Sequence, residues 1–156
     1  EKNPGFSPGS PWRFSSAVAD FRHYFGRALY HARCGDGRRA AFFLGAASHL
    51  VQDLCVPHHA RAKVLDGHKR YEAWAGRHYT KYAVERGGIY HQEHPTHSLL
   101  LGNAALAADF FGWVDEGGTD LSYHKATAVL LPRAQRTTAG LFLQFYAAAG
   151  GALQAA

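Results

Sequence analysis

Residues 38–60 of the chain read RRAAFFLGAASHLVQDLCVPHHA, and this stretch decides the fold. From Ala40 to Leu54 the stretch is almost continuously apolar. Pro57 ends the pattern, because the residue before a proline avoids helical backbone angles. We therefore expect a helix over about residues 38–54 that is apolar nearly all round and lies buried at the centre of the domain.

The same stretch begins a set of candidate metal ligands. His49 and Asp53 lie four residues apart, so both side chains emerge on one face of the expected helix. His68 and Glu72 repeat this spacing on the next expected helix, and His59 lies in the connection between the two helices. Neutral imidazole and carboxylate together suit Zn²⁺. Two separate pairs exceed what one four-ligand site needs and indicate two or three zinc ions, the usual device for hydrolysing phosphodiesters.

Each pair alone also has a simpler interpretation. His49 and Asp53 can form a buried hydrogen bond without a metal. His68 and Glu72 can form a solvated pair on a helix surface. We expect His58 to have a surface role rather than to bind a metal. The other histidines are interpreted as part of a solvated loop around Pro95 (His91, His94 and His97) or as structural residues on helices (His23, His31, His78 and His124).

Composition sets the fold class. Ala accounts for 27 of the 156 residues, whereas the chain has 7 Val and 1 Ile. An excess of helix formers over β-branched residues predicts an all-α fold, a multi-helix bundle forming one domain over residues 1–156. Residues 1–14, rich in Pro, Gly and Ser, are expected to be an irregular arm. Further helices are expected over about residues 15–33, 68–84 and 98–114, from Asp120 as the cap of a fifth, and from Pro132, which begins or kinks a sixth, to about Ala149.

Several classes of protein are excluded or disfavoured. The longest apolar run, Leu99 to Val114, contains Asn103 and Asp109 and is too short and too polar to span a membrane. Glycine-rich phosphate loops, serine nucleophile elbows and basic runs interleaved with aromatic residues are absent from the sequence. The formal charge of +5 favours anionic partners, or is only that of a basic surface.

The two cysteines, Cys34 and Cys55, fit no zinc-finger or redox spacing and could pair or stay free. The chain begins with Glu1 and contains no methionine, so we expect a mature, trimmed or truncated form.

The stretch from Phe42 to Ala60, followed by His68-Lys-Arg-Tyr-Glu72, resembles the bacterial zinc-dependent phospholipase C family. That family carries the pattern His-x-x-x-Asp-x-x-x-Pro-x-His-Ala and then His-x-x-x-Glu. The resemblance extends over about residues 15–150, with Ala134–Gly140 similar to the last helix of the family. It implies an all-helical fold of the phospholipase C and P1 nuclease type that holds up to three zinc ions, a phospholipid substrate at a membrane surface, and export from the cell.

The resemblance also implies roles for the ligands. His49 and Asp53 resemble the ligands of one zinc ion, His59 and His68 those of a second, and Glu72 a ligand shared with a third. The remaining ligands of the family, including the candidate catalytic base, come from an N-terminal segment that would precede Glu1. We therefore expect an N-terminally incomplete domain that binds fewer zinc ions, with no catalytic base assigned.

Three functions remain open at this stage. The first is a zinc-dependent phosphodiesterase that cleaves phospholipid headgroups by means of a metal-activated water. The second is a single-strand nuclease of the S1/P1 type, which is less favoured because those enzymes tend to have Asp at the position of Glu72 and a Gly-Gly-Asn stretch after that of His59. The third is a non-catalytic helical domain that zinc stabilises and that binds a membrane or a partner.

Overall fold

The computed structural model describes residues 11–63, 65–90 and 96–150, with the backbone alone for residues 11–15. Within these ranges the chain forms helices and no strand, so the all-α prediction is confirmed. The helices are α1 (Pro11–Arg33), α2 (Gly37–Asp53), α3 (Pro57–Arg61), α4 (His68–His78), the 3₁₀ helix η1 (Tyr79–Tyr82), α5 (Ser98–Ala108), α6 (Phe111–Val114) and α7 (Asp120–Ala148).

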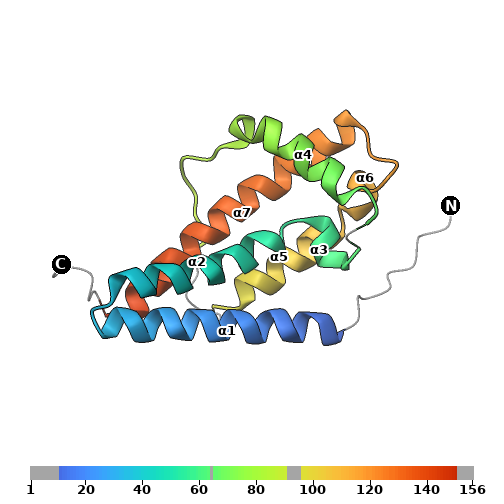
Figure 1. Ribbon diagram of the computed structural model, residues 1–156. Coiled ribbons are helices and arrows are strands. Elements are labelled where there is room, and N and C mark those ends of the chain that lie inside the picture. Colours follow the sequence, from blue (N-terminus) through green and yellow to red (C-terminus); the bar gives the residue numbers. More distant parts are fainter. Residues whose placement is uncertain (1–10, 64, 91–95, 151–156) are drawn as a thin grey trace.

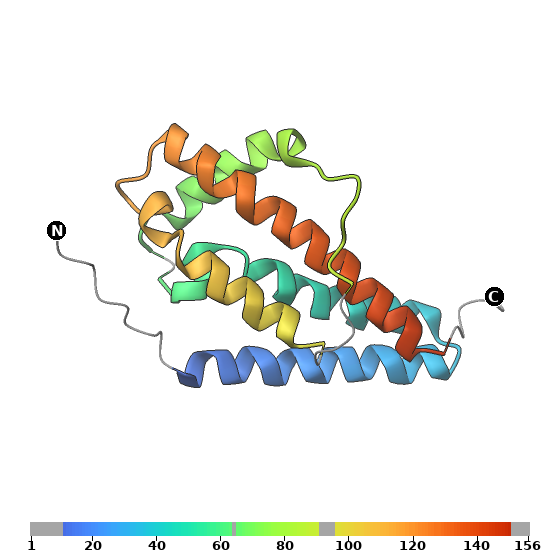
Figure 2. The same cartoon turned by 180° about the vertical axis from the view of Figure 1, so that it is seen from behind.

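The long helices pack in layers. A tight turn joins α1 to α2, and the two helices lie side by side along one edge of the molecule (Figure 1). The α2, α5 and α7 helices contact one another behind this pair, and α4 packs on the first half of α7 (Figure 2). The core between them includes Phe21, Val51, Leu100 and Leu141, each at most 1% exposed. This packing leaves α3 and the start of α4 together at one end of the bundle.

The α2 helix is not the central buried helix that the sequence predicts. Ala47, Ser48 and Val51 on one face are buried, but Gly45, His49 and Gln52 on another are exposed, and Phe42 is 71% exposed. The reason is the number of neighbours: α1, α5 and α7 cover the other faces of α2, and no described segment covers this one. Apolar composition all round a helix therefore did not reveal which face is covered.

One buried amide joins three helices. Asn103 on α5 is fully buried and donates hydrogen bonds to the Val51 carbonyl on α2 (2.9 Å) and to the Thr137 hydroxyl on α7 (3.0 Å). Its own oxygen accepts a hydrogen bond from Nε of Arg133 (2.9 Å). The Val51 carbonyl lies in the last turn of α2, where carbonyls lack helical partners. The interaction therefore satisfies a helix end and fixes the positions of α2, α5 and α7.

Several predicted boundaries were wrong. The first helix begins at Pro11, since proline is well tolerated in a first helical turn. The third ends at His78 and continues as η1, and the fourth breaks at Asp109 and Phe110 into α5 and α6. The expected arm therefore holds part of α1 over residues 11–14, and residues 1–10 lie outside the described residues.

The last helix differs most from its prediction. Thr119, and not Asp120, caps α7, through a capping box with Ser122. The helix then continues through Pro132 to Ala148, where the sequence predicts a new start or a kink. Packing against α2, α4 and α5 along its length holds α7 together despite the lost backbone hydrogen bond.

None of the helices in the described part of the chain is long and apolar enough to cross a membrane.

Candidate metal centre

The turn between α3 and α4 brings two histidines together. Pro57 begins α3, which ends after five residues at Ala62 in the left-handed conformation (φ 53°). Gly67 caps α4 with φ 83°, and a Cβ atom there would lie 2.8 Å from the backbone carbon of Asp115, so only glycine fits this close approach. With both ends of the turn fixed in this way, the ring of His59 on α3 faces that of His68 on α4, with centroids 4.7 Å apart.

Three candidate ligand atoms converge at this point. Nε2 of His59 lies 2.9 Å from Nε2 of His68. Oε1 of Glu72 lies 2.8 Å from the same His68 nitrogen and 3.6 Å from the His59 nitrogen. A proton on His68 can be donated to only one of the two neighbours, so a cation is the partner that would satisfy all three atoms at once. Among the described residues, only these three form such a group.

The donor set fits zinc. Ligands about 2 Å from a tetrahedral ion lie about 3.3 Å from one another, close to the separations of 2.8–3.6 Å found here. Two imidazoles and one carboxylate are a usual set for a zinc ion that keeps a fourth position open. The side chains of His68, His59 and Glu72 are 14%, 28% and 45% exposed, so the group lies at the surface end of a cleft.

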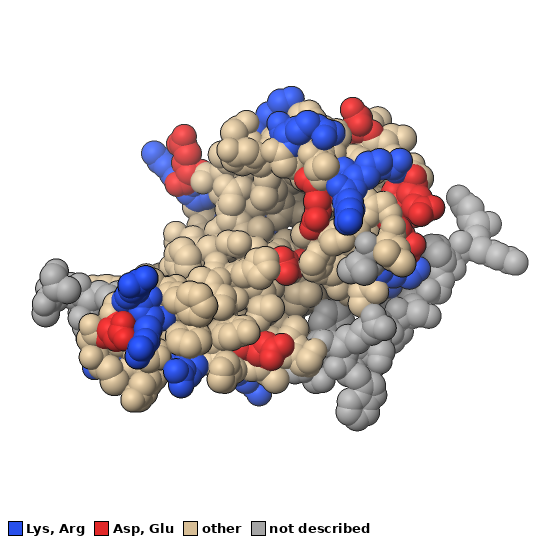
Figure 3. Space-filling view, in the orientation of Figure 1, with Lys and Arg blue, Asp and Glu red and all other residues tan. Residues whose placement is uncertain are grey.

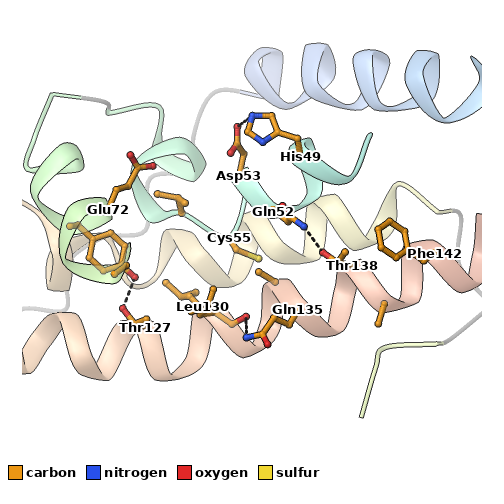
Figure 4. A pocket seen from close by; sticks show the side chains of 16 residues that line it. His49, Gln52, Asp53, Cys55, Glu72, Thr127, Leu130, Gln135, Thr138 and Phe142 are labelled. Carbon is orange, nitrogen blue, oxygen red and sulfur yellow. Dashed lines mark hydrogen bonds and ion pairs between the residues drawn. The ribbon is translucent and has the colours of Figure 1, made fainter. Parts of the chain in front are cut away.

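His49 and Asp53 form a second pair beside this group. Nε2 of His49 lies 3.3 Å from Oδ2 of Asp53, and the histidine side chain is 71% exposed. The same Asp53 oxygen is 3.8 Å from Nδ1 of His59, on the side of the ring that faces away from Glu72. His59 therefore connects the pair to the group of three, but the five predicted residues do not form one compact cluster. Figure 4 shows Asp53 and His49 in contact and Glu72 separate from them.

The prediction of a surface role for His58 was wrong. Its side chain is fully buried, and Nε2 donates a hydrogen bond to the Asp66 carbonyl (2.8 Å). Burial lowers the pKa of His58, although this hydrogen bond acts in the opposite direction. The ring packs against those of His68, at 5.1 Å, and Phe111, at 5.3 Å. His58 thus supports the turn that carries the candidate ligands.

The other histidines fall into two groups. His31, His78 and His124 have structural contacts: the His31 ring stacks on Phe43, the His78 ring stacks on Trp74, and the His124 ring accepts or donates a hydrogen bond with the Tyr82 hydroxyl. His23 packs edge-on against Tyr24. His97 contacts Arg22 at the start of α5, and His91 and His94 lie outside the described residues.

One supporting residue was missed by the sequence analysis. Arg70 lies between His68 and Glu72 on α4, and its guanidinium donates to the carbonyls of Glu116 (2.6 Å) and Gly118 (3.2 Å) and to the Tyr123 hydroxyl (2.7 Å). These bonds hold the first turn of α4 against the turn between α6 and α7. No signal in the sequence identifies this role, because its partners are backbone atoms about 45 residues away.

Comparisons with known proteins point to one kind of enzyme. Part of the chain is 27% identical over 119 residues to a phospholipase C of Clostridium perfringens, covering 71% of this chain and 29% of that protein. A phospholipase C from a type A strain of the same organism is 25% identical over 167 aligned positions, covering 90% of this chain and 41% of that protein. No protein-family model matches the chain. The relationship is distant, and the chain spans less than half the length of these relatives.

Proposed function

We propose that the chain carries part of a zinc-dependent phosphodiesterase centre of the phospholipase C type, with His59, His68 and Glu72 binding one zinc ion. The observation that carries the proposal is the convergence of two ring nitrogens and a carboxylate oxygen, from α3 and α4, to separations of 2.8–3.6 Å. The distant similarity to phospholipase C supports the same chemistry. A phospholipid substrate at a membrane surface and export from the cell belong to this proposal.

The residues of this chain would divide the work as follows. His59, His68 and Glu72 hold the ion and leave one coordination position open for a water or a phosphate oxygen. Asp53 faces Nδ1 of His59, and a carboxylate in this place orients the ring so that Nε2 points at the ion. The chemistry that a bound zinc ion supplies is activation of water and neutralisation of charge on the phosphate.

His49 and Asp53 are proposed as ligands of a further zinc ion, as the family resemblance implies. Two protein ligands do not make a zinc site, and no other described histidine or acid joins them in a group of metal-binding geometry. This second site would therefore need ligands from outside the described residues, and we assign no catalytic base to this chain.

Metal analysis and lipid hydrolysis test the proposal together. The chain is loaded with zinc, its metal content is measured by mass spectrometry, and turnover of phosphatidylcholine is followed. We expect at least one bound zinc ion, and Glu72→Gln should weaken zinc binding at least about 10-fold, by loss of one ligand. The matched control is Glu85→Gln, an exposed glutamate outside the centre, which should bind zinc like the unchanged chain. A protein that stays metal-free after loading and hydrolyses no lipid contradicts the proposal.

A second candidate, a zinc-stabilised helical domain without activity, is favoured by the exposure of His49 and by the isolation of its pair from the group of three. It predicts that zinc binds and raises the melting temperature while no ester is cleaved. If the zinc-loaded chain cleaves single-stranded DNA faster than phosphatidylcholine, the centre is of the nuclease type instead.

A further inference from the structure

A long cavity extends from the candidate metal centre between α2, α4 and α7. Its volume is about 740 Å³, within the range of small-molecule sites. Glu72 and Asp53 line one end of the cavity and Phe142 lines the other (Figure 4). On α7 the lining runs from Thr127 to Phe142, a rise of about 22 Å along the helix. The cavity is therefore a trough, elongated and open to one face of the molecule.

Charge is confined to one end of this trough. Asp53 and Glu72 are the only carboxylates in its lining, and the lining holds no lysine or arginine. The walls beyond them are largely apolar, with Val56, Leu130, Leu131, Ala134, Ala139 and Phe142 among the lining residues. Figure 3 shows uncharged side chains over most of the middle of this face.

The polar residues in the walls are already engaged within the protein. The Gln52 amide nitrogen donates to Ser48 and Thr138, and the Tyr71 hydroxyl is bonded to Thr127. Gln135 donates to two backbone carbonyls and accepts from the backbone N–H of Val84. The middle of the trough thus offers an occupant apolar contact and little hydrogen bonding.

We propose that this trough binds a long alkyl chain of a lipid whose phosphate lies at the candidate metal centre. The proposal rests on the proposed function for the position of the phosphate. Three features carry it: the trough is continuous with the centre, its charge lies only at that end, and its walls suit a chain without hydrogen-bonding groups. Ala139 and Phe142 at the far end then set the longest chain that fits.

The test measures binding of alkylphosphocholines by titration calorimetry, in a chelator so that neither zinc nor hydrolysis is required. Octyl-, decyl- and dodecylphosphocholine are used below their micelle concentrations. Burial of each added methylene, at about 0.8 kcal/mol, should tighten the dissociation constant up to about fourfold. The failure of hydrolysis in the preceding test would leave this result unaffected, so the two proposals fail separately.

Substitutions then locate the binding site. Ala139→Trp should fill the far end and abolish the gain from octyl to dodecyl, whereas Ala128→Trp, on an exposed position of the same helix outside the trough, should keep it. Phe142→Ala removes a side chain that is 46% exposed, so folding is safe, and it should weaken dodecyl binding but not octyl binding.

Three results would overturn the inference. The first is an affinity that does not change with chain length, and the second is an equal gain with length in Ala139→Trp and Ala128→Trp. The third is a stable dimer by light scattering that Ala139→Trp dissociates and that binds no alkylphosphocholine. In that case a second copy of the chain, and not a lipid, occupies the trough.

Discussion

Asn103 shows how much a single buried side chain determines in this molecule. Replacement by alanine leaves the Val51 carbonyl and the Arg133 guanidinium without their partner. We expect Asn103→Ala to lower the free energy of unfolding by about 2–4 kcal/mol, since unsatisfied buried polar groups are costly. Urea denaturation measures the change. Adding Arg133→Ala should cost less than the sum of the single changes, and full additivity would contradict a shared network.

The two cysteines, whose pairing the sequence left open, are both free, with Cys34 exposed and Cys55 buried. They lie at opposite ends of α2, a separation of about 25 Å that no disulfide spans. Burial raises the pKa of the Cys55 thiol to about 12, so the reactive thiolate is absent at neutral pH. We expect iodoacetamide to label Cys34 within minutes and Cys55 only after unfolding, as measured by mass spectrometry. Equal labelling rates in Cys34→Ser and Cys55→Ser variants would show this assignment to be wrong.

The candidate ligands were predicted from sequence because their spacing is local. His68 and Glu72 lie one helical turn apart, and any helix at this position brings them close. The position of His59 depends on the α3–α4 turn, and that of His58 on rings from α4 and α6, contacts that no local pattern encodes. The ligands of the centre were therefore within reach of the sequence, whereas the residues that hold them in place, His58 and Arg70, were not.

Elements were harder to predict than residue pairs wherever tertiary contacts override local preference. Pro132 normally ends a helix, yet α7 passes through it because α2, α4 and α5 pack along its length. The apolar run from Leu99 to Val114 breaks at Asp109, and no proline or glycine marks the break. Both differences come from packing that involves residues distant in the sequence.

Gly140 tests the packing of one such element. On α7 it lies against the carbonyl group of Ile89, and a Cβ atom would collide with this backbone oxygen. We expect Gly140→Ala to destabilise the fold by about 1–3 kcal/mol, the usual cost of overpacking. Gly26→Ala, at a position in α1 where the added carbon meets nothing within 4 Å, should stabilise it by about 0.5–1 kcal/mol. Thermal unfolding of both variants decides, and the same sign for the two would contradict the close approach of residue 89 to α7.

At the scale of the whole molecule, the composition predicted the fold class but not its open side. An exposed strip on α2, including Phe42 and His49, and the trough beside α7 lie on the same face. Hydrophobic periodicity indicates which residues avoid water, but not which neighbour covers them, since a covered and an uncovered apolar face have the same sequence pattern. The proposed lipid-binding trough was for this reason beyond sequence analysis.

Zinc should stabilise the whole molecule if His59, His68 and Glu72 bind it in the folded state alone. The ion would join α3 to α4, and zinc at about 100 times its dissociation constant would add about 2.7 kcal/mol to the free energy of unfolding. For a chain of 156 residues this corresponds to a rise in melting temperature of about 5–10 °C, reversed by a chelator. Differential scanning calorimetry with and without zinc measures the rise.

Two histidine variants assign the effect to the group of three. His68→Ala should abolish the rise, because two ligands remain, whereas His49→Ala should retain it, because His49 contacts Asp53 and none of the three ligands. The exposed His49 side chain makes this replacement a mild control for the loss of an imidazole. An equal loss in both variants would mean that zinc binds across both pairs. A rise that survives in His68→Ala would place the stabilising ion elsewhere and remove the basis of the proposed centre.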